Sequence, residues 1–314
     1  MILSARFMLR ENFNSGDFMD KIIRCITSDG AVMAAAVDAS DIVFTAQRIH
    51  KTTPVGTAAL GRLLCAGSLM GANLKQSKAT INLSVKGDGP LGNVFVVGDS
   101  DGNVRGYVSN PECETQYYNN GKINVAAGVG RAGTLGVIRD YGQGEPYIGQ
   151  VPLVSGEIAE DITNYYATSE QIPTVCGLGV LVDKEDSEVL LAGGFLIQLL
   201  PGADDSTIDK IEANISKLEP VTTMLAKGFS ILEICKKALE GFDVEVLDES
   251  EINYVCSCSR AKLENYFAGL SEDEIRGLPD ESGVCEVNCQ FCRKTYSFTA
   301  DDLNRIIKDR AKKS

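Results

Sequence analysis

Two close pairs of cysteines near the end of the chain constrain its fold more than any other feature of the sequence. Cys256 and Cys258 form the first pair, and Cys289 and Cys292 follow after thirty intervening residues. Each pair fits on one tight turn, and folding of the segment between them can bring four thiolates into the tetrahedral arrangement that zinc prefers. The two-residue spacing of the second pair is usual in zinc sites, whereas the single residue inside the first pair leaves little slack. The pattern predicts a metal site, either a structural zinc ribbon or a thiol switch that opens as well as closes.

Charge and histidine content narrow the class of function. The 314 residues carry a formal net charge of −13, which argues against broad nucleic-acid binding because that requires a basic surface. The only histidine is His50, so histidine-based hydrolytic triads and histidine-rich metal sites are nearly excluded, and we interpret His50 as a surface or loop residue.

The cysteine count and the absence of a secretion signal indicate a reducing, cytoplasmic compartment. The chain has ten cysteines, and in such a compartment paired cysteines serve metals or redox chemistry more often than structural disulfides. The sequence contains no run of eighteen apolar residues, so it predicts no membrane span.

We expect an α+β protein in three parts. Residues 18–202 should form an N-terminal mixed α/β domain with antiparallel-rich sheets, residues 203–250 a helical linker, and residues 251–314 a small C-terminal zinc-binding domain. Residues 1–17 lack a long apolar core followed by a cleavage site, and we interpret them as a vector-derived or mis-assigned leader.

The first domain contains two clear sheet signals. Residues 22–37 are apolar around the turn Ser28–Gly30, which predicts a hairpin, and residues 79–140 alternate between turns as in an antiparallel meander. Between these, residues 53–73 predict a helix that Thr53 caps and Pro54 begins.

Two patterns in this domain suggest chemistry that we reject. Residues 128–133 match the glycine fingerprint of dinucleotide-binding folds, but residues 134–140 continue as a strand and not as the helix that the fingerprint requires. The acidic cluster of the helix expected at residues 156–166 is interpreted as a solvated helix face, because no base or metal motif accompanies it.

The linker is expected to be helical and to lie on another part of the protein. Ser206 with Asp209 and Ser230 with Glu233 have the spacing of capping boxes. An apolar stripe with helical periodicity follows the first of these, and short helices with one apolar face need a partner surface. The stripe consists of Ile208, Ile211, Ile215 and Leu218.

The cysteine-rich module is expected to need its metal in order to fold, since it has few large apolar side chains. Helices are predicted from Arg260 and from Ser271, then a strand around Tyr296, then a last helix that Thr299 caps.

With these residues placed, the chain resembles the redox-regulated heat-shock holdases, often called the 33 kDa chaperonin family. The resemblance rests on Gly61–Leu64, Ser169–Thr174, Ala192–Gln198 and the cysteine quartet, and extends from about Asp17 to the C-terminus. The quartet is its most specific part, because both spacings and the separation of the pairs fit.

The resemblance implies a cytoplasmic chaperone of the stress response that is not an enzyme. In reduced cells it would bind one zinc ion per chain through Cys256, Cys258, Cys289 and Cys292 and would be inactive. Oxidants would convert these thiolates into two disulfides, release the zinc and open the C-terminal region, and the protein would then hold unfolding client proteins. We expect each cysteine to pair with its near neighbour, and we expect residues 203–250 to be the part that moves. A homodimer is allowed, above all in the oxidised form, whereas neither nucleic acid nor membrane is an expected partner.

Other cysteines and flanking cations leave alternatives open. Cys285 is not part of the family quartet, and we favour an inert buried thiol over a substitute ligand or a competing disulfide partner. Four cations flank the pairs and could offset the charge of a thiolate centre or simply be solvated: Arg260, Lys262, Arg293 and Lys294. Five more cysteines lie in apolar contexts and are predicted to be core residues: Cys25, Cys65, Cys113, Cys176 and Cys235.

Two other classes of function compete with the holdase. A zinc-ribbon protein that binds nucleic acid would need a basic surface, but from Cys256 onward ten Lys and Arg residues balance ten Asp and Glu residues. A thiol-disulfide oxidoreductase using Cys289 and Cys292 would need a thioredoxin-like context, and the other cysteine pair argues against it.

Overall fold

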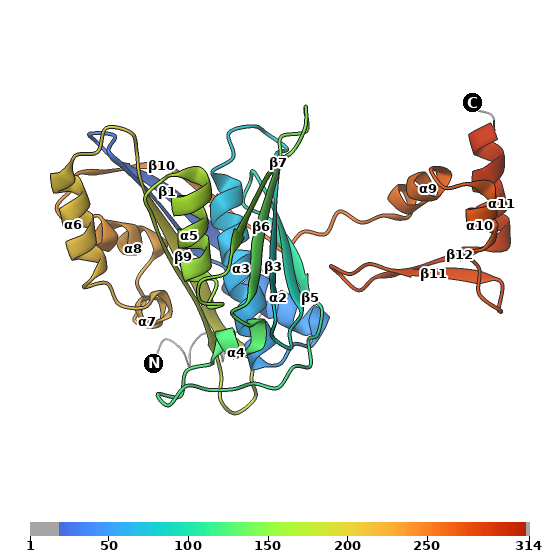
Figure 1. Ribbon diagram of the computed structural model, residues 1–314, viewed down its shortest axis with the longest axis horizontal. Helices are drawn as coiled ribbons and strands as arrows, with labels where there is room; N and C mark the ends of the chain where they lie inside the picture. Colours follow the sequence, from blue (N-terminus) through green and yellow to red (C-terminus); the bar gives the residue numbers. More distant parts are fainter. Residues whose placement is uncertain (1–18, 312–314) are drawn as a thin grey trace. The chain divides into compact units, whose positions relative to one another are not determined.

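The chain folds into two compact units with a boundary between Val255 and Cys256. The computed structural model describes residues 19–311, so the predicted leader at residues 1–17 lies outside the described part. Both units combine helices with antiparallel sheet (Figure 1), which confirms the predicted α+β class.

One five-stranded antiparallel sheet forms the centre of the first unit. The two strands that come first in the chain form the predicted hairpin. The hairpin turns through Gly30, whose φ of 72° lies in the left-handed region. In spatial order the strands are β10 (Val244–Glu251), β1 (Lys21–Thr27), β2 (Val32–Asp38), β9 (Val189–Leu199) and β8 (Thr174–Val182).

A second five-stranded antiparallel sheet contains the predicted meander in its first three strands along the chain, whereas its fourth strand pairs with the first and not with the third. The short helix α4 (Val125–Val129) ends at Gly130, whose φ is 89°, and the predicted strand follows it in place of the helix that the dinucleotide fingerprint requires. In spatial order the strands are β5 (Val104–Val108), β4 (Asn93–Asp99), β3 (Thr80–Gly87), β6 (Gly133–Asp140) and β7 (Tyr147–Pro152).

Helix α3 (Pro54–Ala72) lies between the two sheets and contacts both (Figure 1). A close approach requires Gly71, since a Cβ there would lie 2.5 Å from the Asp99 carbonyl oxygen. Pro54 begins the helix as predicted, but Thr53 does not cap it, because its hydroxyl donates to the Cys113 carbonyl instead. Length and composition would also suit a membrane span, yet 94% of the apolar window is buried inside the protein, as expected of a central core helix.

The expected helix at residues 156–166 consists of α5 (Ala159–Tyr165) and a π-helical turn, η1 (Tyr166–Glu170). The interpretation of its acids as a solvated face is wrong for Asp161, which is fully buried. Its carboxylate accepts backbone N–H groups from residues 154, 155, 156 and 158, so it organises the loop that enters the helix. Glu160 is exposed as predicted.

Residues 203–250 are packed into the first unit. Helices α6 (Asp205–Ile215), α7 (Val221–Ala226) and α8 (Ile231–Ala238) cover the face of the first sheet opposite α3, and the segment ends as its edge strand β10. Ile211 of the predicted stripe is buried there, and Ile215 and Leu218 pack beside it. The capping box at Ser230 is confirmed, whereas α6 is capped by Asp204 and not by Ser206.

The second unit is built on a two-stranded antiparallel sheet and three helices. In chain order these are α9 (Arg260–Ala268), α10 (Glu272–Arg276), β11 (Val284–Asn288), β12 (Thr295–Thr299) and α11 (Ala300–Ala311). The predicted caps at Ser271 and Thr299 are confirmed. Strand β11, which pairs Cys285 with Phe298, was not predicted from the sequence.

Candidate metal centre

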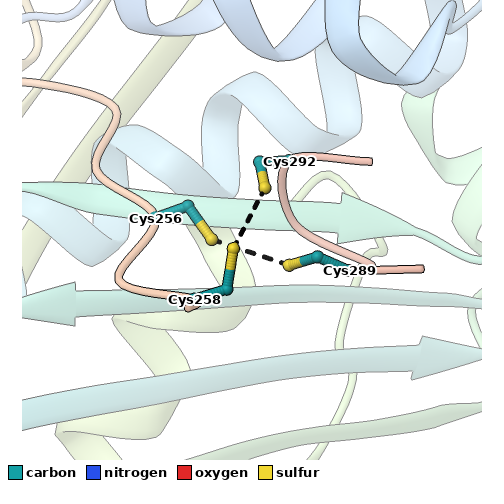
Figure 2. Close-up of side chains that lie close together, drawn as sticks. All are labelled: Cys256, Cys258, Cys289 and Cys292. Atoms are coloured by element: carbon teal, nitrogen blue, oxygen red, sulfur yellow. Dashed lines mark hydrogen bonds between the residues drawn. The ribbon is translucent and has the colours of Figure 1, made fainter. Parts of the chain in front are cut away.

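The four cysteines of the quartet converge on one point. Figure 2 shows the side chains of both pairs facing each other across two turns, and their four sulfurs lie within 4.8 Å of one another. The Sγ of Cys256 is 3.6 Å from that of Cys289, and the Sγ of Cys258 is 3.4 Å from that of Cys292. The structure therefore brings together every residue that was predicted as a ligand.

These distances fit a tetrahedral zinc site. With zinc–sulfur bonds of about 2.3 Å, the sulfurs of a regular tetrahedron are about 3.8 Å apart. All four donors are sulfur, the set that structural zinc sites prefer. Within residues 19–311 no other group of histidine, cysteine or acidic side chains reaches a comparable arrangement.

Each turn is shaped by its own backbone. The second pair lies in the connection between β11 and β12, where the Cys289 N–H donates to the Lys294 carbonyl and the Arg293 N–H donates to the Cys289 carbonyl. Arg293 has a φ of 58°, which closes this tight turn. The first pair directly precedes α9, whose first turn is capped by the Ser259 hydroxyl.

The thiols have unequal electrostatic surroundings. Burial raises the pKa of Cys256 to about 12. Burial acts on Cys258 in the same direction, but hydrogen bonds from Tyr296 and from the neighbouring thiols lower its pKa to about 7. Four thiolates this close together repel one another, and a divalent cation between them would remove that repulsion.

Tyr296 is a site residue that the sequence analysis placed only in a strand. Its hydroxyl lies 3.2 Å from the Cys258 Sγ, and Lys294 lies over its ring, 5.2 Å from the ring centre. Tyr296 lies in β12 and Cys258 directly precedes α9, so this contact depends on the packing of segments that are distant in the sequence, and no local pattern pointed to it.

The contacts of two flanking cations differ. Arg260 fits neither role, because it forms ion pairs with Glu264 and Asp302 and lies 4.2 Å over the Phe298 ring. Lys262 donates to the Ser257 hydroxyl, inside the first cysteine turn, at 3.0 Å.

The remaining cysteines lie apart from the quartet. Cys285 is buried against Phe298 in the core of the second unit, and burial raises the pKa of its thiol, as expected of an inert residue. The predicted core position is confirmed for Cys25, Cys65, Cys113 and Cys235, whereas Cys176 is half-buried.

The first unit ends in a strap, residues 252–255, that joins its two sheets. After β10, Ile252 is buried and donates its N–H to the Asp20 carbonyl. Tyr254 then lies beside β5, where its hydroxyl donates to the Gly106 carbonyl and is 3.3 Å from His50 Nε2. The interpretation of His50 as a surface residue is wrong, because it ends α2 (Ser40–His50) in a buried position next to this strap. The strap leads directly into Cys256.

Two of the motifs that carried the resemblance, Gly61–Leu64 and Ser169–Thr174, contribute to half-buried ion pairs in the first unit. Arg62 pairs with Glu157, and Glu170 accepts from Arg139 at 2.9 Å and from the Tyr165 hydroxyl at 2.5 Å. These contacts fix α5 and η1 against α3 and the second sheet, so their role is architectural.

Comparisons with known proteins agree on one family. The family described as Hsp33 protein matches residues 20–299. A 33 kDa chaperonin from Acetivibrio thermocellus is 45% identical over 92% of this chain and 97% of its own length, and one from Clostridioides difficile is 43% identical over 92% and 99%. The crystal structure of the 33 kDa chaperonin from Thermotoga maritima superimposes with a TM-score of 0.84 at 33% identity, covering 94% of this chain and all of that one.

Proposed function

Because this chain belongs to the Hsp33 family of heat-shock chaperones, we propose that it is a cytoplasmic holdase that its cysteine quartet switches on under oxidation. In the reduced state the protein is inactive. In the oxidised state it holds unfolding proteins without catalysing a reaction and without hydrolysing nucleotide. The observation that carries the proposal is the convergence of four sulfurs from two turns.

The quartet can serve both states because thiolates are ligands as well as nucleophiles. When bound, zinc would hold all four sulfurs as thiolates and tie the two turns together. Thiolates are also the form that peroxide attacks. Two thiols and one molecule of hydrogen peroxide give one disulfide and two molecules of water, so two equivalents oxidise the quartet. Sulfurs joined in disulfides no longer ligate the metal.

The pairing of the disulfides has two geometric solutions. Cys256 with Cys258 and Cys289 with Cys292 remain the predicted pairs, because each pair shares one turn and stays together once the turns separate. The short sulfur–sulfur contacts run instead between the turns, from Cys256 to Cys289 and from Cys258 to Cys292. A cross-turn pairing would keep the two turns tied together, whereas near-neighbour pairing frees them, so only the latter suits a switch that opens.

The surface for clients is proposed to lie under residues 203–250. The helices α6, α7 and α8 cover apolar side chains of the first sheet, among them Leu191, Phe195 and Ile197. The segment is joined to the quartet through the strap, and the second unit has a small core of its own. Loss of order in the second unit would remove an anchor for the segment, and its release exposes two apolar faces that bind unfolded chains without sequence specificity.

The discriminating experiment measures aggregation of a thermally unfolding client in the presence of the reduced, zinc-loaded protein and of the peroxide-treated protein. We expect suppression only after oxidation and its reversal by dithiothreitol. A matched control is Cys285→Ser, which removes a thiol of the same unit outside the quartet and should switch as the parent does. Equal suppression by the reduced and the oxidised protein would refute the switch.

The oligomeric state and the range of partners complete the proposal. We propose that the oxidised form associates as a homodimer through the faces it exposes, and that its partners are unfolding proteins and neither nucleic acid nor membrane. Sedimentation of the reduced and oxidised forms tests the first point, since only the oxidised form should gain mass.

A further inference from the structure

The hydroxyl group of Tyr296 contacts the first cysteine turn from a strand that begins just after the second. Its oxygen lies 3.2 Å from the Cys258 Sγ, within hydrogen-bond distance for sulfur. The side chain belongs to the small core of the second unit, and only 8% of the residue is exposed. A buried side chain outside the quartet therefore contacts one of the four sulfurs.

We propose that Tyr296 is a positioning residue of the metal centre, whose hydroxyl holds the Cys258 thiolate in place and slows oxidation of the first cysteine pair. The inference rests on the proposed function, because it assumes that zinc binds the quartet and that peroxide oxidises it. It goes beyond that function by naming a residue outside the quartet that sets how much oxidant the switch needs. Tyr296 acts through Cys258 and is neither a metal ligand nor oxidised itself.

The state of the sulfur decides the direction of the hydrogen bond. A cysteine that binds zinc is a thiolate, which has no proton to give and can only accept. The Tyr296 hydroxyl is therefore the donor in the metal-bound state, and a hydrogen bond to a charged acceptor is stronger than one between neutral groups. Four thiolates outweigh the charge of one divalent cation, so the donor also offsets part of the negative charge that remains.

Strand pairing fixes the position of this hydroxyl. Tyr296 pairs with Val287 of β11, and Phe298, two residues later on the same face of β12, is fully buried. Lys294 lies over the Tyr296 ring, and its carbonyl accepts the Cys289 N–H at 2.9 Å. One short segment thus contacts both turns, the second through its backbone and the first through the Tyr296 side chain.

Loss of the donor should weaken metal binding. Side chains that hydrogen-bond to metal ligands fix the orientation of those ligands, and removing one typically lowers metal affinity by about 10- to 100-fold. Cys258 is half-buried, so water can replace part of the lost hydrogen bond. We therefore expect the effect to lie at the lower end of this range.

Loss of the donor should also make Cys258 more reactive. In the first step of oxidation, one thiolate of the pair attacks a peroxide oxygen, an S–O bond forms, the O–O bond breaks and the departing hydroxide takes a proton from the solvent to become water. In the second, the other thiolate attacks the sulfenic sulfur, the S–S bond forms, the S–O bond breaks and a second hydroxide leaves and is protonated. The peroxide is reduced by two electrons. Cys258 is the nucleophile in one of these steps whichever sulfur reacts first, and a hydrogen bond to its sulfur lowers its nucleophilicity.

The second cysteine pair provides an internal comparison. Among the hydrogen bonds of residues 19–311, the Tyr296 hydroxyl joins the sulfur of Cys258 and not that of Cys289 or Cys292. Loss of the hydroxyl should therefore change the first pair more than the second. A general loosening of the second unit would change both pairs alike.

The first test measures the metal site. Full-length Tyr296→Phe, which keeps the buried ring, competes for zinc with a chromophoric chelator beside the parent, and we expect about tenfold weaker zinc binding by the variant. The matched control is Tyr266→Phe, which removes the hydroxyl of a tyrosine of the same unit that is 67% exposed, and it should bind zinc as the parent does. Unchanged zinc affinity in Tyr296→Phe would overturn the proposal.

The second test separates the loss of one hydrogen bond from a loss of stability. The zinc-loaded proteins are treated with hydrogen peroxide for increasing times, free thiols are blocked with N-ethylmaleimide under denaturing conditions, and the free fraction of each quartet cysteine is measured by peptide mapping. We expect Cys256 and Cys258 to be oxidised several-fold faster in Tyr296→Phe than in the parent, while Cys289 and Cys292 change less. Equal acceleration of all four cysteines would show that the substitution only loosens the unit, and no acceleration would show that the hydroxyl does not restrain Cys258. Either result overturns the proposal.

The outcomes separate the role of Tyr296 from the holdase. Weaker zinc binding and faster oxidation of the first pair in Tyr296→Phe, in a protein that never suppresses aggregation, refute the proposed function and leave the role of Tyr296 standing. Suppression of aggregation by the oxidised parent, with Tyr296→Phe identical to it in both tests, refutes the role of Tyr296 and leaves the holdase standing.

Discussion

The two units differ in what stabilises the fold of each. The first has a continuous apolar core in which side chains of both sheets surround α3, and a second apolar layer under α6, α7 and α8. The second unit buries a short set of residues and adds the four-sulfur cluster: Phe267, Ile275, Cys285, Tyr296, Phe298, Leu303 and Ile306. A domain of this size rarely buries enough apolar surface to be stable alone, so we expect the fold of the second unit to depend on a metal bound at the sulfur cluster.

The second unit also concentrates its packing around one ring. Phe298 and Phe267 form a T-shaped pair with ring centres 5.0 Å apart, and the Arg260 guanidinium lies over the Phe298 ring. In the first unit, the apolar packing is distributed over two sheets and several helices. A substitution at one core position of the second unit should therefore destabilise the whole unit. In the first unit, a single core substitution should lower the stability only by the contacts that it removes.

Removal of the metal should have the largest effect. We expect a chelator, or Cys289→Ser, to unfold the second unit and leave the two-sheet core of the first folded, because structural zinc supplies on the order of 10 kcal/mol or more to such a domain. Hydrogen exchange of residues 256–311 measures the loss, with Cys285→Ser as the control that keeps all four ligands. A second unit that stays protected without metal would show that its apolar core suffices.

Truncation of a core side chain should have the next largest effect, and its consequence should depend on which layer it belongs to. Ile234 of α8 and Leu64 of α3 are both fully buried, in the outer and the central layer respectively. Replacing either with alanine should cost about 2–5 kcal/mol. We expect Ile234→Ala to loosen α8 and suppress client aggregation without oxidation, and Leu64→Ala to lower the stability of the first unit without activating it. Chaperone assays on the reduced variants distinguish the two, and equal activation would contradict a specific role for the outer layer.

Local patterns in the sequence predicted much of this molecule. The turn at Ser28–Gly30, the capping boxes at Ser230 and Ser271 and the cysteine spacings all act over a few residues, and each is where it was expected. The dinucleotide fingerprint could be rejected for the same reason, because the strand after it is a local signal.

Features that depend on distant segments could not be predicted. From the sequence alone, Asp161 was interpreted as one acid of a solvated helix face. Only the folded loop shows that four backbone N–H groups converge on its carboxylate. Cys25 and Cys235 each fit a core position, but only the docking of α8 on the first sheet places them in one apolar layer. The hydroxyl of Tyr296 reaches Cys258 only because β12 packs beside the turn that precedes α9, 38 residues earlier in the chain.

A buried acid should give the first unit an unusual response to pH. Burial and the nearby Asp38 raise the pKa of Asp20 well above its ordinary value, although the N–H groups of Asp41 and Ile42 partly oppose this. Because the folded state binds this proton more tightly than the unfolded state, the stabilising contribution is complete below the ordinary pKa and is lost as pH rises through the raised one. Urea denaturation between pH 4 and 8 should therefore show a steeper loss of stability with pH in the parent than in Asp20→Asn. Parallel pH profiles would contradict the assignment.

The smallest effect should come from two matching helix caps, one in each unit. Ser230 with Glu233 and Ser271 with Glu274 form the same capping box, at the starts of α8 and α10. Replacing serine with alanine at either position removes a hydrogen bond to a backbone N–H of the first turn and should cost about 1 kcal/mol of stability.

The two substitutions should differ in their consequences. Loss at Ser230 weakens the docking of α8, so we expect Ser230→Ala to shorten the delay before client binding under peroxide, whereas Ser271→Ala should lower the thermal stability of the metal-loaded second unit and leave the docking of α8 unchanged. The first effect is measured by stopping the oxidation at successive times and assaying suppression of aggregation with the same client each time. The second is measured by thermal unfolding followed by tyrosine fluorescence. If both variants shorten the delay equally, the opening of the second unit and not the docking of α8 limits the rate of activation.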